Sequence, residues 1–216
     1  MKWGSDNIGK IQWGSSVIGK VYFGSDLVYQ KSQPNPYRVI DGINYDGNVY
    51  YKISGFHLQG SDTIKFSFRA TEIRCNILGC YTDDRAQDNY SLYVSTASSA
   101  KYLRYNGSTY SSRIAVNTRY NVTFSPTGTS GMRTNSSWSE KTFTSAADFY
   151  IGTTSDSAAV TSSKLVGTMY GNIEVVGRET FVPVVRIADS AIGYLGSVSG
   201  TFYTNQGSGT PVEYTS

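Results

Sequence analysis

The densest group of acidic side chains in this 216-residue chain lies in the segment YTDDRAQD, which carries Asp83, Asp84 and Asp88. A hard cation such as Ca²⁺ needs several oxygen ligands, and one loop can supply them, so these residues are weak candidates for a calcium site. The turn-forming composition of the segment favours a simpler interpretation, a solvated loop without metal. We therefore expect no cofactor and no firm metal site.

Catalytic arrangements of carboxylate, serine and histidine side chains are not evident. Enzymes that cleave polysaccharides on an all-β scaffold use a pair of carboxylates, which a spacing of two or four residues places on one face of a strand. No segment has such a Glu-x-Asp-x-Glu pattern, and the single histidine, His57, has no Gly-x-Ser-x-Gly nucleophile turn to serve. The phosphate-binding pattern Gly-x₄-Gly-Lys-Ser/Thr is also missing. We expect that the protein is not an enzyme.

The two cysteines, Cys75 and Cys80, lie in the segment RCNILGCY. In a strand, a separation of five residues places them on opposite faces, so we expect two buried thiols and no disulfide between them. A Cys-x₄-Cys pair with one histidine in the whole chain supplies too few ligands for zinc.

Aromatic residues in polar, turn-rich stretches are the candidates for binding a glycan, because an exposed aromatic ring offers a flat apolar face for a sugar. The competing interpretation is that these residues line strands, where aromatic side chains are favoured. The candidates are Tyr81, Tyr90, Tyr105, Tyr110 and Trp138.

The composition favours an all-β fold with a single core. Hydrophobic residues make up 39% of the chain and charged residues only 16%, while 18 Tyr and 22 Gly suit strands and turns rather than helices. The net charge is +3, and the basic residues are scattered along the sequence rather than clustered as in a nucleic-acid-binding surface. No apolar run reaches membrane-spanning length, and the first residues lack a signal-peptide pattern, so we expect no membrane insertion.

Short alternating segments predict antiparallel strands. In TIKFSFRA, one face carries Ile64, Phe66, Phe68 and Ala70, and the other carries polar side chains. RYNVTF repeats the pattern. Five further short runs occur along the chain, which has no convincing helix: YSLYV, KYLRY, DFYIG, GNIEVVG and FVPVVRI. Such strands predict an antiparallel β-sandwich or jelly roll.

The first thirty residues consist of three copies of a ten-residue unit, each with an aromatic residue, Gly-Ser and then an aliphatic residue. One unit is the size of a small hairpin, which is marginal by itself in water. We therefore expect residues 1–30 to form a β-repeat stalk that packs against other copies of the chain or docks on a partner protein. The side chains expected at this contact are Trp3, Trp13, Phe23, Ile8, Ile18 and Val28.

Residues 31–37 contain Pro34 and Pro36, which favour an extended linker, and the alternating pattern begins after them. We therefore expect one sandwich domain at residues 38–216.

The C-terminal run FVPVVRIADSAIGYLGSVSGTFYTNQGSGT resembles the signature of laminin-G-like (concanavalin A-like) jelly-roll domains in phage and prophage virion proteins. The resemblance covers residues 38–216 and is most specific toward the C-terminus; its motifs are structural. The acidic residue that usually follows Tyr194 in that family is Leu195 here, so its role does not carry over. The matching positions are Phe181, Pro183, Arg186, Asp189, Gly193, Tyr194, Phe202, Tyr203, Asn205, Gly207 and Gly209.

The N-terminal units are similar to repeats at the start of phage fibre and appendage proteins. Together, the two resemblances imply a non-enzymatic virion structural protein, a head-fibre or tail-fibre subunit or adhesin, made in the host cytoplasm and located in the virion. The implied partners are further copies of the chain, as a trimer, and other virion proteins, with a host-surface glycan as candidate ligand. The alternative is a bacterial or prophage-encoded carbohydrate-binding module.

Overall fold

The computed structural model describes part of the chain in full and part as backbone alone. Backbone and side chains are described for residues 35–72, 75–80, 105, 114–154 and 164–216, and backbone alone for strands within 11–30, 90–104 and 108–112. The chain forms two compact units, residues 1–36 and 37–216. Their boundary falls inside the expected linker.

The N-terminal unit contains two antiparallel hairpins. Strand β1 (Ile11–Trp13) pairs with β2 (Ser16–Ile18), and β3 (Lys20–Phe23) pairs with β4 (Asp26–Gln30). Among the expected contact residues, Trp13, Ile18, Phe23 and Val28 lie on these strands with only their backbone described. Trp3 and Ile8 lie outside the described residues, and assembly through this unit stays a prediction.

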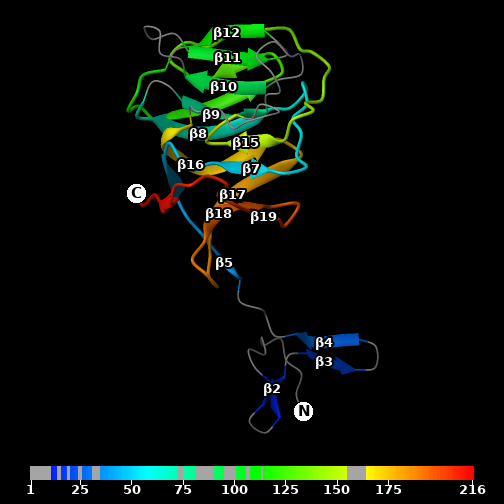
Figure 1. Ribbon diagram of the computed structural model, residues 1–216. Coiled ribbons are helices and arrows are strands. Elements are labelled where there is room, and N and C mark those ends of the chain that lie inside the picture. The colour runs from blue at the N-terminus through cyan, green and yellow to red at the C-terminus, as the bar shows by residue number, and fades with distance from the viewer. Residues whose placement is uncertain are drawn as a thin grey trace. The chain divides into compact units, whose positions relative to one another are not determined.

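Residues 37–216 form an antiparallel β-sandwich, as the sequence predicts (Figure 1). No helix occurs among the described residues. The six-stranded sheet has the order β12 (Ser108–Ser112), β11 (Lys101–Tyr105), β10 (Tyr90–Val94), β9 (Cys75–Cys80), β15 (Phe149–Ile151) and β7 (Tyr51–Ile53).

The second sheet has ten strands (Figure 1). Its main path is β14 (Gly128–Ser130), β13 (Tyr120–Ser125), β8 (Ile64–Ala70), β16 (Val166–Val175), β17 (Glu179–Arg186), β18 (Ile192–Gly196) and β19 (Phe202–Thr204). Off this path, β5 (Tyr37–Val39) pairs with β17, and β6 (Gly42–Asp46) pairs with β16 and β20 (Val212–Glu213).

The alternation in β8 and β13 is confirmed. Ile64, Phe66, Phe68 and Ala70 are buried, whereas Lys65 is exposed between them. In β13, Val122 and Phe124 are buried, and Tyr120 packs partly against the same core. Period-two burial therefore leaves a polar outer face on this sheet.

Aromatic side chains join the two sheets. The Phe181 ring, from β17, is completely buried and lies 5.8 Å from the Phe149 ring, from β15 in the other sheet. Phe56 and Tyr203 also contact Phe181, at centroid distances of 5.3 and 6.0 Å. Such edge and tilted ring contacts add to the free energy of apolar burial.

Both cysteines are buried thiols, as predicted: the side chains of Cys75 and Cys80 are inaccessible and no disulfide joins them.

A buried ion pair fixes the loop after β7. The Arg178 guanidinium donates to the Asp62 carboxylate, which is only 4% exposed, and to the carbonyl oxygen of His57 at 3.1 Å. The backbone N–H of Gln59 also donates to Asp62, and Arg178 stacks over the Phe56 ring at 4.6 Å. The carboxylate is thus held by an opposite charge and a backbone donor together.

The C-terminal signature residues have structural roles. The Asn205 side chain accepts hydrogen bonds from the N–H groups of Tyr50 and Gly207 and donates to the carbonyls of Gly207 and Gly209. Arg186 and Asp189 form a bidentate pair at the β17–β18 turn. The hydrogen bonds that Asp189 accepts, first of all from Arg186, lower the pKa of this carboxyl group to about 2.

Three phenols meet inside the sandwich. The hydroxyls of Tyr45 and Tyr194 lie 3.1 Å apart, and Tyr51 makes edge contacts with both rings. Burial raises the pKa of all three well above the ordinary value near 10.

We expect the alkaline stability of the domain to depend on these tyrosines. A raised pKa in the folded state gives stability that is complete below the unfolded pKa near 10 and is lost as pH rises from there toward the folded values. Near-ultraviolet titration should therefore detect their ionisation together with unfolding, and Tyr51→Phe should make the fall in unfolding free energy with pH shallower. Ionisation of every tyrosine near pH 10 in a folded protein would contradict this expectation.

Candidate functional site

The polar outer face of the ten-stranded sheet is hollowed at the place where β16 changes its neighbour. Along Val166–Tyr170, β16 pairs with β6, and along Ile173–Val175 it pairs with β17. Between these two stretches, residues 171–173 of β16 lie opposite the single residue Phe66 of β8. Extra residues of this kind bend a strand and change where its side chains point.

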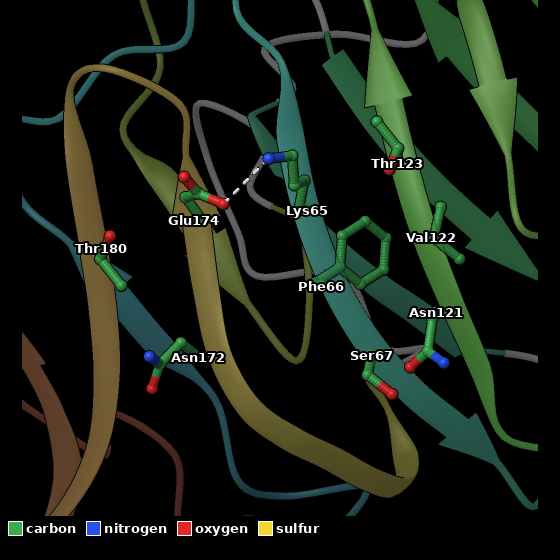
Figure 2. Close-up of a pocket in the computed structure, with 9 residues that line it drawn as sticks. All are labelled: Lys65, Phe66, Ser67, Asn121, Val122, Thr123, Asn172, Glu174 and Thr180. Atoms are coloured by element: carbon green, nitrogen blue, oxygen red, sulfur yellow. Dashed lines mark ion pairs between the residues drawn. The ribbon is translucent and has the colours of Figure 1, made fainter.

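The first depression, here called the Lys65 hollow, has a volume of about 440 Å³. It extends across β13, β8, β16 and the start of β17 (Figure 2). Amide, hydroxyl and charged groups are presented on its walls, and the carboxylate of Glu174 lies 3.3 Å from the Lys65 ammonium. Its lining residues are Lys65, Phe66, Ser67, Asn121, Val122, Thr123, Asn172, Glu174 and Thr180.

The second depression, the Tyr170 hollow, has a volume of about 450 Å³ and adjoins the first. It combines aromatic and apolar surface with a cation and a carboxylate. Its lining residues are Val39, Ile40, Asp41, Arg119, Tyr170, Gly171, Asn172, Tyr214 and Ser216. Both volumes lie in the range of ordinary small-molecule sites.

Asn172 lines both hollows. The preceding Gly171 has a φ of +57°, a conformation that glycine adopts easily, and its N–H donates to the carbonyl of Asp41 at 2.8 Å. These features shape the bulge that presents the exposed Asn172 amide to the Lys65 hollow (Figure 2). An amide offers both donors and an acceptor, which suits a ligand rich in hydroxyl groups.

A stack of side chains forms the floor of the Tyr170 hollow. The Arg119 guanidinium lies 4.2 Å over the Tyr170 ring, and the Tyr214 ring contacts Tyr170 edge-on at 4.9 Å. Arg119 Nε donates to Ser67 Oγ at 3.1 Å. The cation is therefore held in place while it remains exposed to solvent.

Two predicted glycan-binding aromatics belong to the core. Tyr105 is 1% exposed, and its hydroxyl donates to the carbonyl of Gly60 at 2.8 Å and accepts from the N–H of Lys141 at 3.0 Å. Trp138 is 9% exposed and stacks on Tyr105 at 5.2 Å. Neither ring face is open to a sugar, so Tyr105 and Trp138 are corrected from ligand candidates to packing residues.

The other candidates cannot be placed at the site. Tyr90 and Tyr110 lie on β10 and β12, of which only the backbone is described. Tyr81 and the acidic residues Asp83, Asp84 and Asp88 lie outside the described residues. Where side chains are described, no cluster of three or more His, Cys, Asp or Glu residues could hold a metal ion.

His57 lies away from both hollows. Its Nδ1 is 3.1 Å from the carbonyl oxygen of Ala147, and its Nε2 is 3.9 Å from the Asp148 carboxylate. This carboxylate also pairs with Lys52 at 3.1 Å and accepts from the N–H of Gly55.

The described part of the chain contains no helix long and apolar enough to cross a membrane.

The residues of the two hollows were not identified from the sequence. Asn172 lies in GNIEVVG, which predicts a strand but not the bulge within it, and Arg119 lies just before β13. The outward positions of β8 and β13 were the available signal, because alternation predicts that Lys65, Ser67 and Arg69 share a face.

The domain is thus an antiparallel β-sandwich with a polar, hollowed outer face on its larger sheet. No family model matches the chain, and no curated protein matches its sequence.

Proposed function

We propose that this chain is a non-enzymatic structural subunit of a phage virion appendage, and that residues 37–216 bind a host-surface glycan. In this proposal the sandwich is a laminin-G-like jelly roll, and the glycan binds across the Lys65 and Tyr170 hollows. The observation that carries the binding role is the continuous polar face that the two hollows form through Asn172.

The chemistry of this face suits a sugar chain better than bond cleavage. Asn121, Thr123, Asn172 and Thr180 offer amide and hydroxyl groups to ring hydroxyls. Among the nine residues lining the Lys65 hollow, Glu174 is the single carboxylate, and Lys65 neutralises it. A second carboxylate for acid–base or nucleophilic glycoside chemistry does not lie among them.

In the proposed appendage, the two N-terminal hairpins connect subunits. Two-stranded hairpins are marginal in water and gain stability by packing against a partner, and the preferred assembly is a trimer. Multivalent display would then raise the avidity of a weak glycan site. The head or tail of the virion is an equally suitable location.

The alternative is a bacterial or prophage-encoded carbohydrate-binding module. It is favoured by the separation of residues 37–216 into their own compact unit, which suits a module joined to other domains. Light scattering on the full chain and on residues 37–216 tests the difference. The appendage proposal expects the full chain alone to be oligomeric; two monomers at micromolar concentration would contradict self-assembly through residues 1–36.

We expect Asn172→Ala to weaken glycan binding roughly 2- to 10-fold, the effect of losing one or more neutral hydrogen bonds. The measurement is a glycan array followed by calorimetric titration of the best-bound oligosaccharide. Gln59→Ala is the matched control, because it removes an exposed amide outside both hollows. An oligomeric sample that binds no glycan would contradict the binding role and leave a mechanical one, whereas release of reducing sugar would contradict the non-enzymatic role.

A further inference from the structure

Building on the proposed glycan-binding function, we propose that Arg69 and Arg119 together bind an anionic group of the glycan, a carboxylate, sulfate or phosphate. Both residues belong to the outer face of the ten-stranded sheet, beside and within the Tyr170 hollow. The inference follows from their register, their present contacts and the charges around them.

The register of β8 and β13 makes the two arginines cross-strand neighbours. Tyr120 lies opposite Phe68 and Asn121 opposite Ser67 in this antiparallel pair. The next residues along the two strands are therefore Arg119 and Arg69, which lie side by side where the pairing ends. Their side chains reach two residues of β16 that are two positions apart in the sequence: Arg119 lies over Tyr170, and Arg69 contacts Thr168.

Neither guanidinium has an ion-pair partner among the described residues. Arg119 uses its Nε to donate to Ser67, and its two terminal nitrogens make no hydrogen bond to a described group. Arg69 makes one long contact, 3.5 Å from its terminal nitrogen to Thr168 Oγ1. The Nε of Arg69 is buried and has no hydrogen-bond partner.

This arrangement carries an energetic cost that an anion would remove. Like charges placed opposite each other on two strands destabilise the pair. An oxyanion between the guanidinium groups would neutralise the repulsion and could accept paired N–H donors, the geometry in which arginine binds carboxylate and phosphate groups.

None of the other described charged side chains near the two arginines forms an ion pair with them. Lys65 and Glu174 neutralise each other in the adjoining hollow. Asp41 lines the Tyr170 hollow with Arg119, but its carboxylate accepts from the Ser216 hydroxyl at 3.0 Å and is exposed. No ion pair joins Asp41 to a described cation, so neither guanidinium is held in an ion pair within the described part of the domain.

The test compares matched anionic and neutral glycans on the full chain. The probes are oligogalacturonate and its methyl ester, a sulfated cello-oligosaccharide and its unsulfated parent, and glucose 6-phosphate beside glucose. Calorimetric titration should give tighter binding for at least one anionic member of these pairs, and that member identifies the group. Arg119→Gln and Arg69→Gln should each weaken this binding roughly 10- to 100-fold, the range for charge-assisted hydrogen bonds.

Two control variants separate geometry from net charge. Arg119→Lys keeps the charge but loses the planar pair of donors, so it should restore only part of the affinity. Lys141→Gln removes one positive charge at an exposed residue outside both hollows and should leave binding unchanged. Circular dichroism confirms that each variant is folded before it is titrated.

The outcomes distinguish this inference from the function on which it rests. Equal binding of charged and neutral partners, or full affinity in both glutamine variants, would overturn the arginine site and leave glycan binding intact. Absence of binding to every probe and to a glycan array would overturn both.

Discussion

Replacing Asp62 with alanine should lower the free energy of unfolding by about 3–5 kcal/mol, the range for removing one partner of a buried ion pair. Asp62 is 4% exposed and accepts from both Arg178 and the N–H of Gln59. Its loss leaves the half-buried guanidinium of Arg178 without this carboxylate and a backbone donor without its acceptor. Chemical denaturation monitored by tryptophan fluorescence measures the change.

The control for Asp62 is a second Asp–Arg pair in the same domain. Asp189 pairs with Arg186 at the β17–β18 turn in solvent-exposed surroundings, where ion pairs contribute little. Asp189→Ala should therefore change stability far less. Similar losses in the two variants would show that the burial of Asp62 is not what makes its pair important. Asp62→Asn, which keeps the shape but not the charge, should fall between wild type and Asp62→Ala.

Truncation of Phe181 should cost about 3–5 kcal/mol of unfolding free energy, as large-to-small changes of buried aromatic residues do. The ring is completely buried and contacts Phe149 of the opposite sheet as well as Phe56 and Tyr203. Phe181→Ala therefore opens a cavity at the interface of the two sheets and removes three ring contacts. Thermal and denaturant unfolding should detect the loss in full-length protein.

Two variants calibrate the Phe181 result. Phe181→Leu keeps most of the apolar volume and should lose less than half as much stability. Val198→Ala removes apolar atoms at a position that is 77% exposed, so it should have almost no effect. If Phe181→Ala were as mild as Val198→Ala, the sheets could not be packed through this ring.

Alternation of apolar and polar residues was enough to predict the strands that carry the site. Ile64–Ala70 and Tyr120–Ser125 form β8 and β13, with Phe66, Phe68 and Val122 buried. The same rule explains why Lys65 and Thr123 face outward together. This alternation is a local feature of the sequence, so it can be recognised without knowing which strand will pair with the segment.

The site itself depends on contacts that a linear pattern does not contain. Asn172 lines both hollows because β16 changes its partner from β6 to β17 around a bulge. Arg119 becomes a neighbour of Arg69 only through the register of β8 and β13. Both relationships join segments far apart in the chain.

Tyr105 is a residue that the sequence wrongly predicts to be a ligand contact. It follows a strand-like segment and precedes the polar stretch NGSTYSS, which suggested an exposed ring. Its hydroxyl instead satisfies the backbone groups of Gly60 and Lys141, and Trp138 covers its face. A tyrosine in a polar sequence can be buried when distant backbone groups meet its hydroxyl.

The first strand of the sandwich, β5, has a mechanical consequence. β5 pairs with β17, Arg38 forms a bidentate pair with Glu213 of β20 at 2.7 Å, and the Tyr37 ring contacts Phe202 of β19 at 5.3 Å. A pull transmitted from the N-terminal unit reaches this strand first. The load is then divided among three other strands, so the point of attachment resists peeling more strongly than a three-residue strand held by one ladder would.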